Sequence, residues 1–251
     1  WCVGKWWSST KTAITTGADG ARSVYAADID GDGDMDVLSG SRFDNTIAFH
    51  QNGDATGGDG DGSSWTETEI TTGALTRSVF AADIDGDGDM DVLSASGNTI
   101  AFYRNGDSTS GGGDGSTWAE TEIATTSTTS IVAWSVFAAD IDEDGDMDVL
   151  SASSRTTGSS RAGTIAFYQN GDGTSGDGDG SSWTETEIAN GDDGARSVYA
   201  ADIDEDGDMD VLSASSRIFV SSRIGRTAFY RNGNGTSGDG DGSSWTETEI
   251  A

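Results

Sequence analysis

Short apolar runs rich in Val, Ile, Phe, Tyr and Thr recur along the whole chain, and no segment shows a 3.6-residue apolar period. Four similar runs begin the pattern: SVYAA at 23–27, SVFAA at 78–82, SVFAA at 135–139 and SVYAA at 197–201. Each is followed by VLSG or VLSA, by TIAF or TAF, and by a segment that starts at Trp65, Trp118, Trp183 or Trp245. The pattern predicts four strands in each of four repeats and almost no helix. Asn-Gly pairs at 52–53, 105–106, 170–171 and 232–233 predict turns after the third strands.

The segment DID[GE]DGDMDVL also recurs four times, at 28–38, 83–93, 140–150 and 202–212, with starts 55, 57 and 62 residues apart. Four antiparallel strands in a period of about 60 residues fit the blade of a β-propeller. An Ala-Ala pair ends each first strand, as suits strands crowded around an axis. These strands are apolar on both faces, as expected when neighbouring blades cover both. A β-solenoid is the less favoured alternative, because its rungs are usually shorter.

We therefore expect an all-β protein, a β-propeller or propeller segment of four four-stranded blades, at 19–72, 73–126, 127–189 and 190–251. An Asp-rich loop is expected in each blade. Residues 1–18 are predicted to add an N-terminal strand, because 7–18 resembles the closing strand and connection at 63–74. The last repeat has its own closing strand, so this extra strand predicts a longer array or closure with other copies.

The formal net charge of −31 argues against nucleic-acid binding, because no basic stripe could neutralise phosphates. Eight Trp, eight Phe and five Tyr argue against a disordered acidic chain. No apolar run reaches the roughly 18 residues of a membrane span. The single cysteine, Cys2, allows no internal disulfide. Cation binding is the remaining explanation of the charge.

Each Asp-rich loop has carboxylates at positions 1, 3, 5, 7 and 9 and Gly at position 6. Ca²⁺ takes six to eight oxygen ligands, and the Gly permits the bend that brings position 9 back. Without a cation, two carboxylates about 5 Å apart repel by roughly 3 kcal/mol at an effective dielectric of about 20. We expect about four Ca²⁺ ions, one per repeat. The expected metal residues are Asp28, Asp30, Asp32, Asp34, Asp36, Asp83, Asp85, Asp87, Asp89, Asp91, Asp140, Asp142, Asp144, Asp146, Asp148, Asp202, Asp204, Asp206, Asp208 and Asp210.

An EF-hand begins with the same pattern but needs Glu at position 12, where this chain has Ser39, Ser94, Ser151 and Ser213. Oxygen-only ligands disfavour zinc and copper. Solvated Asp-Gly turns would explain one copy, but not four with fixed spacing. A second acidic segment, GDGDGSSW at 58–65, 176–183 and 238–245, is interpreted as a solvated turn rather than a weaker cation site.

The DIDGDGDMDVL segment between two strands resembles the calcium loop of FG-GAP/VCBS-type repeats, the blades of integrin-α-like propellers. The resemblance covers roughly residues 19–251. It implies calcium binding through the side chains of positions 1, 3, 5 and 9 and through the backbone carbonyl of position 7. The Phe-Gly…Gly-Ala-Pro signature is absent, and the family usually closes with seven blades.

Nine of the eleven arginines fall on the propeller face opposite the acidic loops. They could simply offset the acidic field, or they could contact an acidic glycan or the acidic face of another copy. Trp134 is the one residue that breaks the repeat pattern near the axis, and it could stack on a sugar. The candidate contact residues are Trp134, Arg155, Arg161, Arg217, Phe219, Arg223 and Arg226, most of them in the predicted loops 153–163 and 215–225.

No catalytic site is expected, since the only histidine, His50, occupies a strand position held by Tyr in the other repeats. The expected function is a calcium-binding extracellular structural or adhesion module that contacts other proteins, the matrix or further copies of itself. The alternative is a calcium-stabilised lectin for an acidic glycan. An extracellular or cell-surface location follows from calcium being near millimolar there. Asn234 begins an N-glycosylation motif that fits a surface turn.

Overall fold

The computed structural model describes most of the 251-residue chain. The described residues are 12–53, 57–58, 60–73, 75–106, 112–125, 131–157, 160–173, 176, 178–191, 194–219, 222–233, 235, 238 and 240–250. They form strands, turns and irregular segments without any helix, so the described part offers no helical membrane span.

Sixteen strands make four antiparallel sheets, each a meander in which consecutive strands pair. Blade 1 holds β1 (Ala21–Ala27), β2 (Asp36–Ser41), β3 (Thr46–Asn52) and β4 (Trp65–Thr72). Blade 2 holds β5 (Thr76–Ala82), β6 (Asp91–Ser96), β7 (Thr99–Asn105) and β8 (Trp118–Thr125). Blade 3 holds β9 (Ile131–Ala139), β10 (Asp148–Thr157), β11 (Ser160–Asn170) and β12 (Trp183–Gly191). Blade 4 holds β13 (Gly194–Ala201), β14 (Asp210–Phe219), β15 (Ser222–Asn232) and β16 (Trp245–Glu249).

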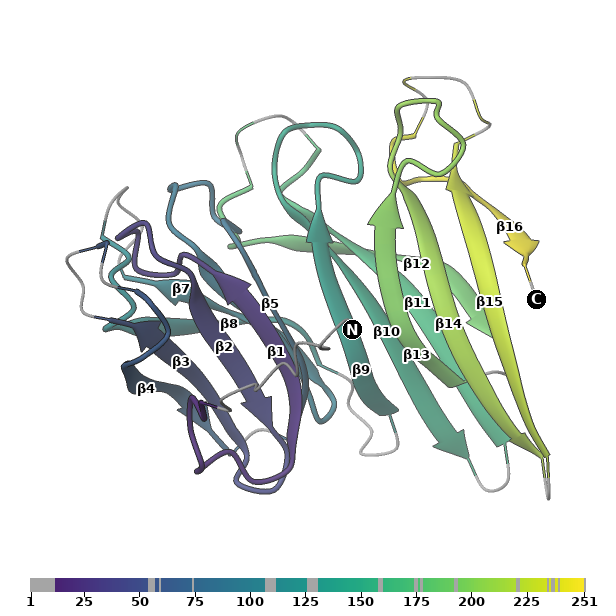
Figure 1. Ribbon diagram of the computed structural model, residues 1–251. Coiled ribbons are helices and arrows are strands. Elements are labelled where there is room, and N and C mark those ends of the chain that lie inside the picture. Colours follow the sequence, from purple (N-terminus) through teal and green to yellow (C-terminus); the bar gives the residue numbers. More distant parts are fainter. Residues whose placement is uncertain are drawn as a thin grey trace, which may run out of the picture.

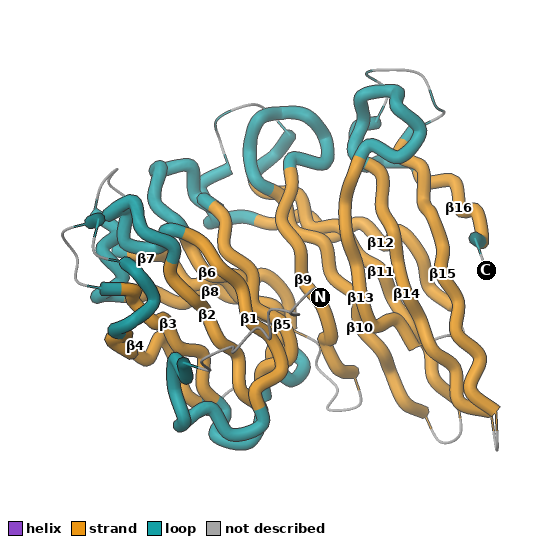
Figure 2. Tube along the Cα trace, viewed as in Figure 1, coloured by secondary structure: helices purple, strands orange, loops and turns teal. Residues whose placement is uncertain are grey.

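The four sheets follow one another in chain order, from purple to yellow in Figure 1, and do not close into a ring. The first strands β1, β5, β9 and β13 contact each other in succession, so they are the innermost strands of the blades. The prediction of a propeller segment of four four-stranded blades is thereby confirmed. Figure 2 shows the loops that follow these strands gathered at one end of the sheets.

The hydrophobic core lies between blades rather than within them. One cluster joins Ile29, Leu38 and Phe49 of blade 1 to Val79 and Tyr103 of blade 2, and equivalent clusters join blades 2 to 3 and 3 to 4. Both faces of an inner blade are therefore buried, which explains why its strands do not alternate cleanly. Full burial of each large side chain contributes about 1.5–3 kcal/mol, so the repeats depend on their neighbours.

An aromatic column runs through the innermost strands. Tyr25, Phe80, Phe137 and Tyr199 follow each other with ring centroids 4.6, 4.8 and 4.6 Å apart. These tilted contacts lie in the range of favourable aromatic pairs. The Ala-Ala pairs that end the same strands leave room for this close approach.

Two predicted loops are in fact strands. Residues 153–157 and 160–163 extend the pairing of β10 with β11 up to Thr157↔Ser160, and residues 215–219 and 222–225 extend that of β14 with β15 up to Phe219↔Ser222. The prediction of long loops is wrong, because Thr, Ile and Phe in these segments favour strand pairing.

The predicted N-terminal strand falls partly outside the described residues, which begin at Thr12. The described residues 12–18 contain no strand. Thr15, Gly17 and Ala18 nevertheless line a pocket against the β2–β4 face of blade 1. Residues 71–73 and Leu75 line the corresponding pocket against blade 2. The segment thus lies where the connection from a preceding blade would lie.

Candidate metal centres

Each Asp-rich loop connects the innermost strand of a blade to its second strand, at the upper end of the sheets in Figure 1. We number them loop 1 (28–36), loop 2 (83–91), loop 3 (140–148) and loop 4 (202–210). In every loop, three carboxylates bring oxygen atoms within 4.8 Å of one another. The gathered residues are Asp28, Asp30 and Asp32; Asp83, Asp85 and Asp91; Asp140, Asp142 and Asp148; and Asp202, Asp204 and Asp206.

The glycine at position 6 shapes the loop. Gly33 has a φ of 94°, and its N–H donates to Asp28 Oδ2 at 3.0 Å. The other three loops repeat this hydrogen bond at 2.9, 3.0 and 3.1 Å, each from a glycine with positive φ. Only glycine adopts this backbone region without strain, so the bend predicted from the sequence has a direct cause.

Several carboxylate oxygens in the loops are buried without a hydrogen-bond partner. At position 5, Asp32 Oδ1 accepts the N–H of Asp34 at 2.8 Å, but Asp32 Oδ2 has no partner. A buried anionic oxygen without a donor is costly, and a divalent cation among several of them removes that cost. The donor set therefore fits Ca²⁺. The oxygens concerned are those of Asp28, Asp32, Asp83, Asp87, Asp140, Asp144, Asp204 and Asp206.

The aspartate at position 9 anchors the loop to the sheet. Asp36 accepts the N–H of Ile29 at 3.0 Å and that of Asn52 at 2.9 Å, one on each oxygen. In loops 2 and 3, burial raises the pKa of Asp91 to about 7 and that of Asp148 to about 8, despite equivalent hydrogen bonds. Both still lie within the gathered carboxylates. In loops 2 and 3, position 9 thus anchors the loop and also lies among the gathered carboxylates. In loops 1 and 4, Asp36 and Asp210 anchor the loop but are not among them.

The aspartate at position 7 contacts the second acidic segment of its blade instead of the gathered carboxylates. Asp34 Oδ2 accepts the N–H groups of Gly58 and Gly60 at 2.7 and 2.9 Å, from the second acidic segment of its own blade. Asp89, Asp146 and Asp208 receive equivalent N–H groups. These side chains are not among the gathered carboxylates. They hold the GDGDG segments over the loops, an arrangement compatible with cation binding through the position 7 carbonyl.

The second acidic segments therefore serve as braces. Their carboxylates Asp61, Asp114, Asp179 and Asp241 accept the N–H of the serine two residues later, at 2.9, 3.0, 2.9 and 2.9 Å. Such local Asx contacts stabilise a turn. The interpretation as a solvated turn misses the contact with position 7, which a spacing pattern within one loop does not reveal.

The asparagines of the Asn-Gly pairs connect several backbone segments through their side chains. From the sequence they are predicted only as turn residues. Asn170 is fully buried, and its side-chain N–H₂ donates to the carbonyls of Ile84, Met147 and Gly178. Ile84 belongs to loop 2, one blade earlier. Asn105 and Asn232 reach the preceding loop in the same way, through Ile29 and Ile141. The identical position of Asn in four repeats is the signal that could have indicated this role.

A side chain from the third strand of each blade contacts the aspartate at position 3 of the loop. This side chain is neutral in blades 1 and 3 and positively charged in blades 2 and 4. In loops 1 and 3 the neutral amides of Gln51 and Gln169 donate to Asp30 and Asp142. In loops 2 and 4 the cations Arg104 and Arg231 form ion pairs with Asp85 and Asp204. The four centres therefore fall into two electrostatic classes.

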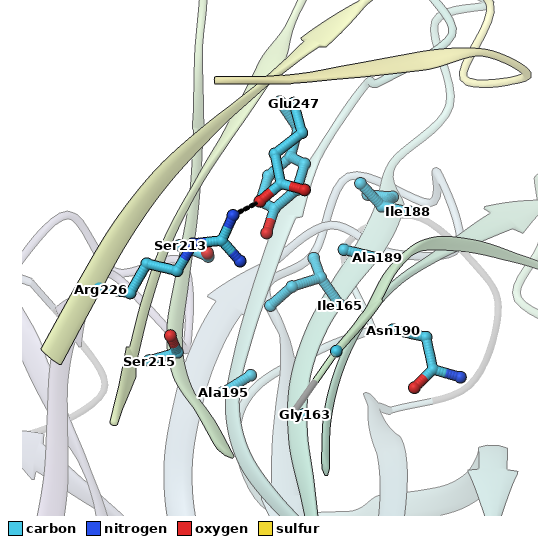
Figure 3. Close-up of a pocket in the computed structure, with 12 residues that line it drawn as sticks. Gly163, Ile165, Ile188, Ala189, Asn190, Ala195, Ser213, Ser215, Arg226 and Glu247 are labelled. Atoms are coloured by element: carbon cyan, nitrogen blue, oxygen red, sulfur yellow. Dashed lines mark hydrogen bonds and ion pairs between the residues drawn. The ribbon is translucent and has the colours of Figure 1, made fainter. Parts of the chain in front are cut away.

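The predicted contact residues are placed as follows. Arg226 pairs with Glu247 and Glu249 of β16, beside the pocket between blades 3 and 4 shown in Figure 3. Arg155 is exposed on β10, and Trp134 lies on β9. The side chains of Arg161, Arg217, Phe219 and Arg223 lie outside the described part of the structure, as does Asn234.

Four-stranded blades with an Asp-rich loop after each innermost strand define a propeller-type repeat protein. Within that class, a family model described as FG-GAP-like repeat matches residues 3–39, 40–94 and 84–151. These matches cover more than half of the sequence, so the chain belongs to the FG-GAP-like repeat family, and the predicted resemblance is confirmed. A comparison with curated proteins finds no match.

Proposed function

We propose that this protein is a calcium-binding extracellular module with a structural or adhesive role. The observation that carries the proposal is the set of buried, unpartnered carboxylate oxygens gathered in four equivalent loops. FG-GAP-like repeats form structural and binding modules that often bind calcium and are typical of extracellular proteins. Near-millimolar extracellular calcium would keep even modest-affinity sites filled. The chain's own residues hold the ion and keep the loops compact.

A catalytic role is not part of the proposal, although one contact resembles a catalytic pair. Ser39 Oγ lies 2.8 Å from His50 Nε2, and His50 Nδ1 lies 3.7 Å from a carboxylate oxygen of Glu67. Ser39 sits in the middle of β2, which is paired with β1 on one side and with β3 on the other, so the backbone around it is engaged in the sheet. In blade 2, Tyr103 takes the place of His50 and interacts with the equivalent serine and glutamate. The contact is thus a repeated cross-strand bridge.

Calcium titration of the chelated protein by isothermal calorimetry tests the proposal, with about four ions per chain as the expected result. Arg104 and Arg231 should weaken loops 2 and 4, because a nearby cation repels Ca²⁺. We expect Arg104→Gln to tighten one site about tenfold and Gln51→Arg to weaken another by a similar factor.

The two substitutions exchange the same pair of residues in opposite directions, so each controls for the other. Magnesium replaces calcium in a parallel titration and should bind more weakly, because it accommodates such flexible carboxylate cages poorly. Changes of the same sign in the two variants would contradict the electrostatic explanation. No heat of binding from any loop would contradict the calcium proposal itself.

Self-association through the end faces of the array is part of the proposed structural role. Blade 1 leaves Val24 70% exposed, whereas the equivalent Val79 is 4% exposed beneath the preceding blade. Blade 4 leaves Ile203 42% exposed, whereas the equivalent Ile84 is 0% exposed beneath the following blade. The two end faces thus carry matching halves of an interface that occurs three times within the chain. We propose that the blade 4 face of one copy binds the blade 1 face of another.

Replacing Ile203 by Glu should then abolish association, because it places an unpaired charge in an apolar interface. The measurement is sedimentation velocity in millimolar calcium over a range of concentrations. Leu75→Ser, which removes a 45% exposed apolar residue from the connection between blades 1 and 2, is the control and should leave association unchanged. An Ile203→Glu protein that associates like the wild type would contradict this contact.

A further inference from the structure

Four β-bulges place one residue from each innermost strand outside the regular pairing. In β1 the register skips Arg22, between Ala21↔Ser41 and Ser23↔Gly40. The same irregularity leaves out Arg77 in β5, Trp134 in β9 and Arg196 in β13. A bulge redirects the side chain of the extra residue, and bulges are enriched beside functional sites. These four residues lie near the start of the innermost strands, at the end opposite the Asp-rich loops (Figure 1).

The bulge residues of blades 2, 3 and 4 contact each other. The guanidinium carbon of Arg196 lies 3.6 Å from the ring centroid of Trp134, and that of Arg77 lies 4.8 Å from it. The Trp134 ring is itself fixed, because its N–H donates to Ser154 Oγ at 2.8 Å. A guanidinium that stacks on an aromatic ring is fixed in orientation, and its planar N–H fork suits carboxylate-like anions. Trp134 is thus a positioning residue for two cations.

Positive charge is also concentrated at this point. Burial lowers the pKa of Arg77, and the charges of Arg42 and Arg22 lower it further. Among the described residues, no carboxylate forms an ion pair with these three arginines, although Arg104, Arg226 and Arg231 each have one. Repulsion among these neighbouring cations is a cost that a bound anion would remove.

We propose that Arg22, Arg42 and Arg77, with Arg77 held by Trp134, form a site for the sulfate or carboxylate groups of an acidic polysaccharide. The site goes beyond calcium binding, and it would give the proposed adhesive role a ligand. A flexible polysaccharide bound at these arginines interacts mainly with their positive charges, because the protein's acidic residues farther than about 8–10 Å away are screened by salt. A second copy would bring the whole charge of −31. Nucleic acid, with one charge per about 1.7 Å, would need a longer basic stripe than these few arginines.

The test uses calcium-loaded protein and three polymers with one backbone: dextran, carboxymethyl dextran and dextran sulfate. We expect the two charged polymers to bind in calorimetry at about 50 mM salt, with affinity falling as salt rises, and dextran not to bind. The double variant R42Q/R77Q should lose at least tenfold in affinity. Arg226→Gln removes one positive charge from a guanidinium that glutamates already neutralise, and should bind like the wild type.

Arg22→Gln changes an exposed side chain and provides a second variant if the double variant is unstable; it should lose about threefold. Calcium stoichiometry is measured on each variant, so loss of calcium binding and loss of polymer binding are separate results. Equal binding of dextran and dextran sulfate, or undiminished binding by R42Q/R77Q and Arg22→Gln, would overturn the proposal. It would also be overturned if these variants lost self-association while keeping polymer binding, because the basic row would then contact a second copy.

Discussion

Removal of calcium with EDTA is expected to lower the melting temperature by tens of degrees or to unfold the protein at room temperature. A ligand present at 100 times its Kd stabilises the folded state by about 2.7 kcal/mol per site, hence about 11 kcal/mol for four independent sites. Typical domains are stable by only about 5–15 kcal/mol. Chelation also restores the repulsion among carboxylates that lie within 4.8 Å of one another. The measurement is thermal unfolding by circular dichroism, with and without EDTA.

The folding stability should depend on pH in opposite directions in the chelated and in the calcium-loaded protein. In the chelated protein, burial raises the pKa of Asp91 to about 7 and of Asp148 to about 8, against about 3.9 in an unfolded chain. The folded state then binds protons that the unfolded chain lacks, so stability falls as the pH rises from about 4 to 8. With calcium bound, protons compete with the ion instead, and stability falls as the pH decreases through the same range.

Two variants distinguish the contribution of the gathered carboxylates to calcium-dependent stability from that of the second acidic segments. Asp30→Asn removes one of the gathered carboxylates and should reduce the calcium-dependent gain in melting temperature by about a quarter, the share of one site in four. Asp61→Asn removes a charge from the second acidic segment, where the side chain only caps a turn, and should leave the gain unchanged. Restoration of the melting temperature by excess calcium is the control for damage by EDTA. An unchanged melting temperature in EDTA would be incompatible with the calcium proposal.

The sequence predicts the blades well because their determinants are local and repeated. Strand residues, turn residues and the glycine at position 6 each act within a few positions, and four copies remove the ambiguity of any single one. The gathering of Asp28, Asp30 and Asp32 is likewise a property of one short loop. The strands, the turns and the gathered carboxylates can therefore be predicted from residues that are close together in the sequence.

Contacts that depend on the register of a partner strand or on a neighbouring blade could not be predicted in this way. The bulges at Arg22 and Trp134 depend on the register of two strands, which residue spacing in one strand does not give. The extended hairpin at 215–225 depends on pairing between Phe219 and Ser222 rather than on turn residues. The contact of Asn170 with Ile84 joins residues 86 positions apart. The bulges and the hairpin need a partner strand of the same blade, and the asparagine contact needs the preceding blade.

Asn170→Ala is expected to destabilise the calcium-loaded protein by about 4 kcal/mol. Its side chain donates to the carbonyls of Ile84, Met147 and Gly178 and accepts the N–H of Gly180 at 3.0 Å, all in a fully buried position. Each buried group that loses its partner costs about 1–3 kcal/mol, less where water can enter the space. Urea unfolding in saturating calcium measures the change in the free energy of unfolding.

The matched control is Asn52→Ala, the same substitution at the equivalent position of blade 1. Asn52 donates to Met35 and Gly60 and accepts from Gly62, all within its own blade. Its loss should cost about 2 kcal/mol, because fewer groups are left unpaired and the site lies nearer to water. The difference between the two variants isolates the contact between blades. Equal losses would show that the contact with the preceding loop contributes nothing.

The same pair of variants tests whether calcium binding is transmitted between blades. Ile84 lies between Asp83 and Asp85, so the bond from Asn170 fixes the backbone of loop 2 from the next blade. Without it, loop 2 must be ordered by the ion alone, and part of the binding free energy is spent on that ordering. Asn170→Ala should therefore weaken one calcium site about tenfold, whereas Asn52→Ala should leave loop 2 unchanged. A site of unaltered affinity in Asn170→Ala would mean that each loop binds its ion independently of the following blade.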